Sequence, residues 1–299
     1  MLLFIKIKLN NKLKDYNIYS ILMRGFTKKI KNVIFFPSML GQNKKGVERG
    51  PSLIAREIIK KEKELKTKKT NKYWVDVMNA NCIYSNLETL YEYNDNLSGQ
   101  RINIGGDHSM SIATVAHSLN NYENLKVLWI DAHGDINTSY SSPTNNLHGM
   151  PLGYLTNLDN DERFYYILNH VNLKDIMYIG IRDLDIFEKE VIKNTTVIDV
   201  NNFNNKSFIE DIDNFIGKDP IHISFDVDSL DPRYVQSTGT LVKNGLHLRH
   251  VKELFDYLYD KKFKQIKNID ITEFNPKIGS KEDVKNSLKS IMYIFDKYI

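Results

Sequence analysis

The chain has 299 residues, of which 41% are hydrophobic and 26% charged, a composition typical of a globular protein with a large apolar core. Its formal net charge of +4 is small, and acidic and basic residues are interspersed, which argues against a nucleic-acid-binding protein. The single cysteine, Cys82, excludes an intrachain disulfide and favours a reducing compartment. No apolar run approaches the roughly 18 residues that a membrane-spanning helix needs. We therefore expect an intracellular protein that is neither secreted nor inserted in a membrane.

Residues 1–32 form a basic N-terminal extension in which eight Lys and Arg residues accompany a single acid, Asp15. A basic, acid-poor leader is compatible with a mitochondrial transit peptide, and residues 24–27 would suit processing. The scarcity of Ser and Arg favours the other interpretation, a solvated extension of a cytoplasmic protein. The sequence leaves these two interpretations open.

From residue 33 onward, apolar β-branched runs alternate with amphipathic segments. The predicted strands are 33–36, 73–77, 101–104, 126–130, 176–180, 196–200, 220–225 and 266–271. The predicted helices are 51–63, 87–93, 109–119, 161–169, 186–193, 206–216, 249–259 and 281–297. This alternation predicts an α/β fold, a single domain with one eight-stranded parallel sheet and helices on both faces. The longest irregular stretch, 137–151, follows the fourth strand, where such folds commonly place functional loops.

Three short polar segments directly follow predicted strands: residues 105–109 (GGDHS), 131–135 (DAHGD) and 224–228 (SFDVD). On an extended backbone, residues at spacing i, i+2 and i+4 point to one side. Parallel strands deliver their last residues to one edge of the sheet, so these segments are expected to meet there. Because carboxylates can bridge two ions, the sequence predicts a dinuclear metal site. The candidate ligands are His108, Asp131, His133, Asp135, Asp226 and Asp228.

The donor types indicate which metal this site would hold. Four aspartates in the apolar middle of a sheet repel one another unless cations neutralise them. Oxygen donors with a minority of imidazole, and no thiolate, favour Mn²⁺ over structural Zn²⁺, while Fe²⁺, Co²⁺ and Ni²⁺ stay open. A single D-x-D or D-x-H is usually a turn or a helix cap. Three such segments, each after a strand, make a metal site the better interpretation.

With these motifs the sequence resembles the arginases, within the manganese ureohydrolase family, over residues 33–297. Further segments that carry the resemblance are 45–51 (KGVERGP), 145–151 (NNLHGMP), 180–185 (GIRDLD), 238–240 (TGT) and 271–276 (ITEFNP). The resemblance implies a catalytic domain at 33–299 that assembles as a homotrimer or a hexamer. It also implies that one ion is held by His108, Asp131, Asp135 and Asp226, and the other by Asp131, His133, Asp226 and Asp228. In this scheme Asp131 and Asp226 bridge the two ions.

The chemistry implied by this resemblance is hydrolysis of a guanidinium group by a hydroxide that bridges two Mn²⁺ ions. Asp135 would accept a proton from that hydroxide, and His148 would carry a proton to the leaving amine. Glu273 would pair with the guanidinium group, and Thr240 would lie near the reacting carbon.

Selection among guanidino compounds depends on the two ends of the substrate. By resemblance, Asn137, Thr144 and Asn146 would hold an α-carboxylate, and Asp185 and Glu188 an α-ammonium group. Neutral donors suit a carboxylate and acids suit an ammonium group, so L-arginine is the expected substrate, with L-ornithine and urea as products. One alternative is a ureohydrolase acting on agmatine or another guanidino compound. An alternative of another class is a catalytically silent, metal-binding oligomeric scaffold.

Overall fold

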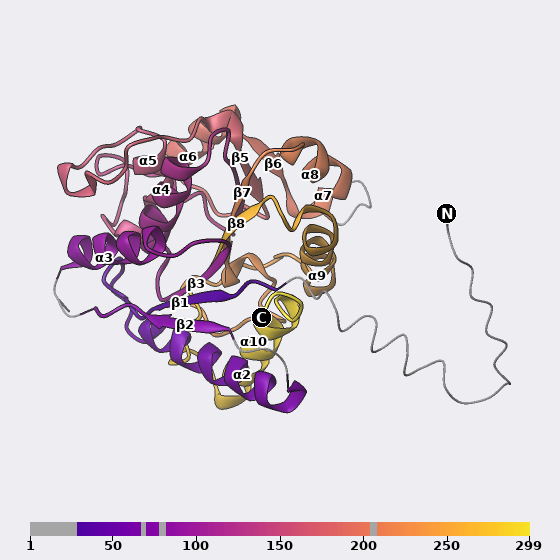
Figure 1. Ribbon diagram of the computed structural model, residues 1–299. Coiled ribbons are helices and arrows are strands. Elements are labelled where there is room, and N and C mark those ends of the chain that lie inside the picture. Colours follow the sequence, from indigo (N-terminus) through magenta and orange to yellow (C-terminus); the bar gives the residue numbers. More distant parts are fainter. Residues whose placement is uncertain (1–28, 67–69, 78–81, 204–207) are drawn as a thin grey trace, which may run out of the picture.

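The computed structural model describes residues 29–66, 70–77, 82–203 and 208–299. Its centre is one eight-stranded sheet in which all neighbouring strands are parallel, in the order β2-β1-β3-β8-β7-β4-β5-β6 (Figure 1). The predicted eight-stranded parallel sheet is thereby confirmed. The strands are β1 Asn32–Phe36, β2 Asn71–Trp74, β3 Arg101–Gly105, β4 Lys126–Ile130, β5 Ile176–Ile179, β6 Thr196–Ile198, β7 Ile221–Asp226 and β8 Ile266–Thr272.

Helices cover both faces of this sheet, as the alternating pattern predicts (Figure 1). On one face, α2, α8, α9 and α10 bury their apolar sides against the sheet, and on the other face α3, α4 and α5 do so. The helices are α2 Gly50–Leu65, α3 Ile83–Asp95, α4 Ser111–Asn121, α5 Pro151–Leu155, α6 Ile186–Val191, α7 Val200–Phe203, α8 Phe208–Ile216, α9 Leu248–Tyr257 and α10 Lys281–Ile294. Among the helices of the described segments, none is long and apolar enough to span a membrane.

The prediction of a helix at 161–169 is wrong. That stretch contains only a 3₁₀ turn, Glu162–Phe164, and some of its backbone N–H groups form hydrogen bonds outside the segment. The side-chain oxygen of Asn120 on α4 accepts the N–H groups of Leu168 and Asn169, which a helix would have used internally. Burial of Phe164 also ties the segment to the core of the α3–α5 face. Tertiary contacts therefore override the local helical pattern.

Other predicted boundaries shift at the sheet margins. The strand predicted at 73–77 forms instead as β2, from Asn71 to Trp74, and the strand predicted at 196–200 ends at Ile198 because α7 follows directly. Two short helices, α5 and α7, have no counterpart in the sequence prediction. Of the basic extension assigned to residues 1–32, residues 1–28 lie outside the described part of the chain. The division into an extension and a catalytic domain therefore stays a prediction.

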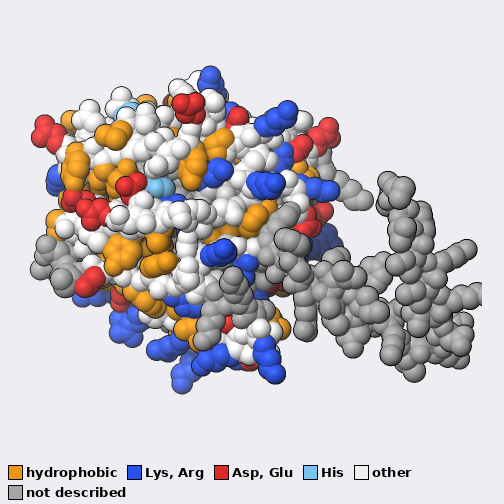
Figure 2. Space-filling model, viewed as in Figure 1, with side chains coloured by type: hydrophobic (Ala, Val, Ile, Leu, Met, Phe, Trp, Pro, Cys, Tyr) orange, Lys and Arg blue, Asp and Glu red, His pale blue; other side chains and the backbone are white. Residues whose placement is uncertain are grey.

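The solvent-facing side chains follow the amphipathic pattern of the covering helices. Figure 2 shows Lys and Arg side chains gathered along the lower rim of the molecule, where α2 lies in Figure 1. Arg56, Lys60 and Lys63 of this helix are exposed, while Ile54 and Ile58 are buried against the sheet. Elsewhere on this face, acidic and basic side chains are interspersed. The basic rim is thus the solvated side of an amphipathic helix.

The central strands carry a row of buried polar residues toward α4. The sheet register places Asn103 of β3, Asp270 of β8 and Ser224 of β7 side by side. All three are completely buried, in strands that are otherwise largely apolar. Buried polar groups need hydrogen-bond partners, so this row is expected to form a network. It lies directly beneath the carboxyl edge of the sheet, where the chain leaves β3, β4, β7 and β8 in four adjacent loops.

Candidate metal centre

All predicted metal ligands lie at the carboxyl edge of the central strands. His108 opens the 3₁₀ turn after β3, and Asp107 caps that turn by accepting the N–H of Ser109. The other ligands leave β4 and β7, which are direct neighbours in the sheet. We call this set the ligand half of the site: His108, Asp131, His133, Asp135, Asp226 and Asp228.

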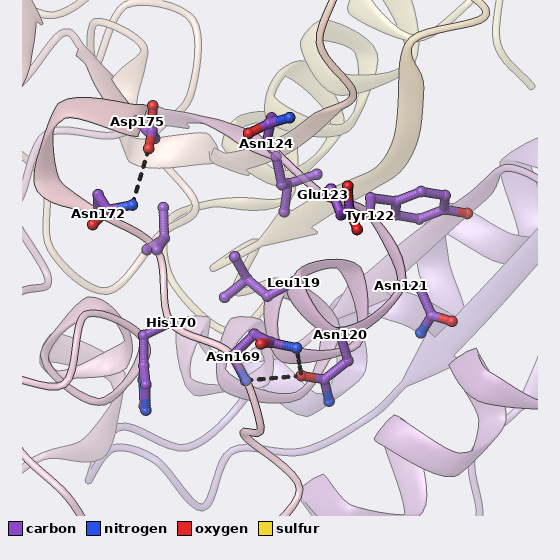
Figure 3. Close-up of a pocket in the computed structure, with 12 residues that line it drawn as sticks. Leu119, Asn120, Asn121, Tyr122, Glu123, Asn124, Asn169, His170, Asn172 and Asp175 are labelled. Atoms are coloured by element: carbon purple, nitrogen blue, oxygen red, sulfur yellow. Dashed lines mark hydrogen bonds between the residues drawn. The ribbon is translucent and has the colours of Figure 1, made fainter.

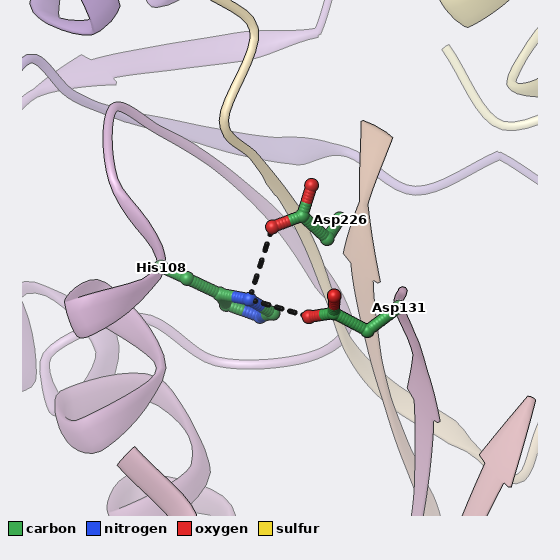
Figure 4. A group of neighbouring side chains, drawn as sticks. All are labelled: His108, Asp131 and Asp226. Atoms are coloured by element: carbon green, nitrogen blue, oxygen red, sulfur yellow. Dashed lines mark ion pairs between the residues drawn. The ribbon is translucent and has the colours of Figure 1, made fainter. Parts of the chain in front are cut away.

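The first group of ligands surrounds the ring of His108. Its Nδ1 atom lies 2.9 Å from Asp135 Oδ2, 3.0 Å from Asp131 Oδ2 and 3.3 Å from Asp226 Oδ2. Figure 4 shows Asp131 and Asp226 pointing toward this nitrogen from different strands. On the other side of the ring, Nε2 hydrogen-bonds Ser224 Oγ at 2.7 Å, which leaves Nδ1 free to bind a cation.

This arrangement fits a metal ion on a structural criterion. His108 Nδ1 and Asp131 Oδ2 are buried and have no hydrogen-bond partner in the described structure, although other donor atoms converge on them. Burial opposes a positive charge on His108, yet Asp131, Asp135 and Asp226 raise its pKa well above the usual value. The carboxylates that attract a proton to this ring attract a divalent cation in the same way. We conclude that the first group can hold a cation.

A second group forms around His133. Its Nδ1 atom lies 3.2 Å from Asp228 Oδ2 and 3.4 Å from Asp131 Oδ1. Asp131 therefore presents one oxygen to each group and would be able to contact an ion in each, although its bridging role stays a prediction. Asp226 faces the first group through Oδ2, while its Oδ1 accepts the N–H of Asp228 at 2.8 Å. Bridging by Asp226 stays a prediction.

The electrostatics of the ligand half are those of crowded acids. Burial, with Asp228 and Asp131 nearby, raises the pKa of Asp226 well above its usual range. Burial and Asp131 likewise raise the pKa of Asp135 to about 6. Such carboxyls retain protons unless another positive charge balances them. A divalent cation is a charge that would let Asp135 and Asp226 ionise.

A buried hydrogen-bond network supports His108 from beneath. Ser224 Oγ lies 3.1 Å from Ser111 Oγ, which donates to Asp270 Oδ2 at 2.9 Å. His222 Nε2 contacts the same carboxylate oxygen at 3.0 Å, and Asn103 donates to Oδ1 at 3.0 Å. Burial opposes ionisation of Asp270, but His222 and the hydroxyl donors hold the pKa of this carboxyl below its usual value. The network is therefore anchored by a carboxylate whose hydrogen bonds are satisfied, and it fixes the orientation of His108, a candidate ligand.

Arg182 fixes the loop that carries the other ligand pair. Its guanidinium group donates to the carbonyl oxygens of Asp228 at 2.8 Å, Val242 at 3.0 Å and Ser229 at 3.1 Å. Thr240 Oγ1, predicted to contact substrate, donates to Asp228 Oδ2 at 2.8 Å. Thr240 thus touches a metal-ligand candidate directly, and Arg182 immobilises the backbone beneath it.

Glu273 and His148, predicted as the guanidinium acid and the proton shuttle, contact each other beside the ligand half. His148 Nδ1 donates to Glu273 Oε1 at 3.1 Å, and the backbone N–H of His108 donates to the same oxygen at 2.9 Å. Glu273 is 2% exposed, whereas the side chain of His148 is 20% exposed. Burial opposes protonation of His148, but Glu273 outweighs it and raises its pKa to about 9. The pair links a buried acid to the solvent.

Two of these residues adopt a left-handed backbone conformation that non-glycine residues rarely take. The φ angle is +50° at Asp135 and +66° at Glu273. Such a conformation costs on the order of 1–3 kcal/mol and persists where surrounding contacts enforce it. At Glu273 the backbone N–H is held by the carbonyl oxygen of Gly106 at 2.8 Å. Both strained positions belong to the candidate site.

The loops around the ligand half carry most of the predicted substrate-binding residues. We call these residues, together with His148, the loop half of the site: Asn137, Thr144, Asn146, His148, Asp185, Glu188 and Thr240. Asn137 Nδ2 donates to Asp185 Oδ2 at 2.7 Å, so a carboxylate-grip residue and an ammonium-grip residue are in contact. Thr144 is exposed and accepts the N–H of Asn146, whose side-chain oxygen accepts from Asn43 Nδ2 at 3.1 Å. These hydrogen bonds join Asn137 to Asp185 and Thr144 to Asn146 in two separate groups, and the binding roles of all four residues stay predictions.

Glu188 is placed differently from the other predicted substrate residues. It is buried, and it forms a capping box with Asp185 at the start of α6. Its Oε2 accepts the N–H of Asp185 and its Oε1 accepts the N–H of Ile136. Burial and Asp135 raise its pKa to about 7. Glu188 therefore connects α6 to the loop after β4, and an effect on substrate would pass through Asp185.

A large groove lies far from this chemistry, at the amino ends of the strands. It has a volume of about 580 Å³ and is lined by residues 119–125 and 169–172 together with Asp175. Figure 3 shows its polar side chains satisfying one another: Asn120 binds Asn169, and Asn172 donates to Asp175. No residue of the ligand half or the loop half lines it.

Sequence reasoning missed four supporting residues: Gln42, Arg182, Ser224 and Asp270. Ser224 and Asp270 could have been found, because Ser224 precedes Asp226 by two positions and a polar residue inside an apolar strand needs a partner. Arg182 stands in one of the segments that carry the resemblance, but no pattern reveals a side chain that binds backbone carbonyls. Gln42 offers no such signal.

The fold and the cluster together define an α/β protein that is built on a parallel sheet and carries side chains that could hold metal ions. Comparison with known proteins makes the assignment specific: a model of the arginase family matches residues 32–294. The chain belongs to the arginase family and is a hydrolase of that family.

Relatives and solved structures agree along most of the chain. Arginase of Entamoeba histolytica is 34% identical over 286 residues, covering 88% of this chain and 96% of its own length. The hepatic arginase of Aquarana catesbeiana is 33% identical over 305 residues, covering 91% and 94%. The crystal structure of E. histolytica arginase with L-ornithine has a TM-score of 0.79 at 31% identity, covering 90% of this chain and 99% of that one. Bacillus subtilis arginase also has a TM-score of 0.79, at 29% identity, with coverages of 89% and 98%.

Proposed function

We propose that this protein hydrolyses L-arginine to L-ornithine and urea with two Mn²⁺ ions. The observation that carries the proposal is the position of Glu273. Its buried carboxylate is hydrogen-bonded to the backbone N–H of His108, so an anion that can pair with a guanidinium group adjoins a cluster that can hold metal. The protein's similarity to arginases along most of its length supports the same substrate class.

The two ions would be held by the ligand half, with Asp131 shared between the groups. Cations bound there would lower the pKa of a bound water, so that hydroxide is present at neutral pH. The donor set, with four carboxylates, two imidazoles and no thiolate, favours Mn²⁺ over structural Zn²⁺ and is also compatible with Fe²⁺, Co²⁺ or Ni²⁺.

The protein's own groups would orient the substrate and move protons. Glu273 would hold the guanidinium group against the ligand half by a charge-assisted hydrogen bond. His148 donates from Nδ1 to Glu273, which leaves Nε2 as the ring nitrogen that can deliver a proton to the leaving amine. Because His148 is part-exposed, it can take that proton back from solvent. Asp135, whose pKa is raised by burial, would accept a proton from the attacking hydroxide.

The loop half would recognise the amino-acid end of the substrate. Asn137, Thr144 and Asn146 offer neutral amide and hydroxyl groups to an α-carboxylate, and Asp185 offers a negative charge to an α-ammonium group. Agmatine has no carboxylate and would leave those donors without a partner, which disfavours it. By family we also propose a homotrimer or a hexamer.

A urea assay on the purified, Mn²⁺-loaded protein tests this proposal. We expect urea from L-arginine and little from agmatine. Urea from agmatine alone would show that the protein is an agmatinase, and urea from neither would favour a silent metal-binding scaffold. Ornithine formation in the same reaction confirms that the bond cleaved lies in the guanidinium group.

A further inference from the structure

A short loop crosses the candidate site and contacts several of its parts. We call residues 41–44 the strap. The carbonyl oxygen of Gly41 accepts the N–H of His148 at 3.1 Å, and the N–H of Gly41 donates to Asp107 Oδ2 at 3.0 Å. The strap is thereby fixed to the loop that carries the shuttle candidate and to the turn that carries His108.

The rest of the strap contacts the other functional loops. Asn43 donates to the side chain of Asn146, and Lys44 Nζ donates to the carbonyl oxygen of Gly239, next to Thr240. Gln42 lies between Gly41 and Asn43 in the strap, and its Nε2 atom donates to Glu273 Oε2 at 2.8 Å. The strap is therefore anchored by hydrogen bonds before and after Gln42. These contacts hold the side-chain amide of Gln42 in place against Glu273.

The hydrogen bonds of Glu273 show what Gln42 leaves available. A carboxylate offers about four lone-pair positions to donors. On Oε1, two are taken by the N–H of His108 and by His148 Nδ1. On Oε2, one is taken by Gln42. By this count, one acceptor position remains on Glu273 for a substrate.

The surroundings of that position are narrow. A Cβ atom placed on Gly239 would lie 4.0 Å from Glu273 Oε2, 3.5 Å from Gln42 Oε1 and 3.4 Å from Lys44 Cδ. The backbone of Gly239 thus lies close to both the strap and Oε2 of Glu273. A planar guanidinium group with several N–H donors can enter in few orientations there.

We propose that Gln42 is a positioning residue that limits the guanidinium group to a single hydrogen bond on Glu273 Oε2 and so orients its carbon toward the ligand half. This inference rests on the proposed arginine hydrolysis, because it assigns Glu273 to the guanidinium group. Gln42 neither reacts nor binds metal. It acts through the carboxylate.

The test replaces Gln42 by Met, which keeps the length of the side chain and removes the donor. We expect kcat/KM for L-arginine to fall about tenfold, since a hydrogen bond to a charged group is lost and the guanidinium group is no longer confined. Inhibition by L-ornithine, which lacks a guanidinium group, should stay within about twofold of the wild-type value. Bound Mn²⁺, measured by metal analysis, should be unchanged. Lys45→Ala is the matched control, because this neighbour on the same loop is exposed.

Three results would overturn the inference. The first is an unchanged kcat/KM for L-arginine in Gln42→Met. The second is equal weakening of L-arginine and L-ornithine, because a collapsed strap would also displace Asn146 and the amino-acid grip. If Gln42→Met does not fold, Gln42→Glu takes its place. This variant sets a like charge against Glu273, so kcat/KM for L-arginine must fall further while inhibition by L-ornithine is retained. The third overturning result is that Gln42→Glu shows no such selective loss. By contrast, a wild-type protein that forms no urea from L-arginine would refute the proposed function itself.

Discussion

The ligand half and the loop half of the site lie at the same edge of the sheet, but they are held in different ways. His108, Asp131 and Asp226 are almost fully buried and lie at the ends of the central strands β3, β4 and β7. His148 and Thr144 lie on the loop after β4, where the first is part-exposed and the second exposed. The ligand half is supported from beneath by a network of buried hydroxyls and Asp270, whereas the loop half is held mainly by contacts between loops.

This difference separates two requirements of catalysis. Metal ligands need fixed positions, since small displacements weaken binding, and strand ends backed by satisfied hydrogen bonds provide them. Substrate groups and a proton shuttle need access to solvent, which loops provide. Glu273 shares features of both parts: it is buried and directly follows β8, yet its carboxylate is contacted by His148 and Gln42, which lie on loops. Substitutions in the two halves should therefore have separable effects on metal content and on turnover.

The largest effect is expected from Asp226→Ala in the ligand half. It removes a carboxylate 3.3 Å from His108 Nδ1 that also accepts the N–H of Asp228, so both groups are disturbed. Metal and activity should be lost together, with activity falling more than about a thousandfold, because several kcal/mol of transition-state stabilisation depend on the cations. Metal analysis and the urea assay measure the two losses. Asp211→Ala, an exposed aspartate of α8, is the control. Retention of both ions by Asp226→Ala would refute a bridging role.

A smaller and more selective effect is expected from His148→Ala in the loop half. The protein should keep its metal, since His148 contacts Glu273 rather than the ligand aspartates, while kcat should fall about a hundredfold, as is usual when a proton-transfer group is removed. The exposed His170 provides the matched control, as His170→Ala. Loss of metal in His148→Ala would mean that the two halves are not separable in the way described.

The two halves also differ in how far the sequence predicts them. His108, Asp131 and Asp226 could be predicted because parallel strands bring their ends together whatever the intervening sequence. Contacts between loops follow no such rule. Gln42 and Glu273 are 231 residues apart in the chain, and their hydrogen bond depends on the path of the strap.

The wrong helix at 161–169 has the same kind of cause. One amide, that of Asn120, takes the backbone N–H groups of Leu168 and Asn169 that a helix would require, and the local sequence does not show this. The periodicity of a segment reports its own preference, whereas the outcome depends on a side chain of α4. The positions of strand ends can be predicted more directly, because they are set by the pairing of strands in the sheet.

The smallest expected effect, and the sharpest comparison, comes from two buried serines of the same network. Ser224 hydrogen-bonds Nε2 of the ligand candidate His108, whereas Ser118 hydrogen-bonds Nδ1 of His222, at 2.8 Å, and accepts from Asn268 at 2.7 Å. Both are completely buried, so replacing either by Ala leaves polar partners unsatisfied and should cost about 1–3 kcal/mol of stability. Only Ser224→Ala releases a ligand ring.

We therefore expect Ser224→Ala to weaken Mn²⁺ binding about tenfold, as is usual when the partner of a ligating histidine is removed, and Ser118→Ala to change it less than about twofold. Competition with a chelator measures the affinity, and thermal unfolding of the metal-free proteins measures the stability cost separately. Equal losses of affinity in both variants would mean that the network acts only by stabilising the core. A loss confined to Ser224→Ala would show that the buried network holds the metal ligand in place, which is the property that distinguishes the ligand half from the loop half.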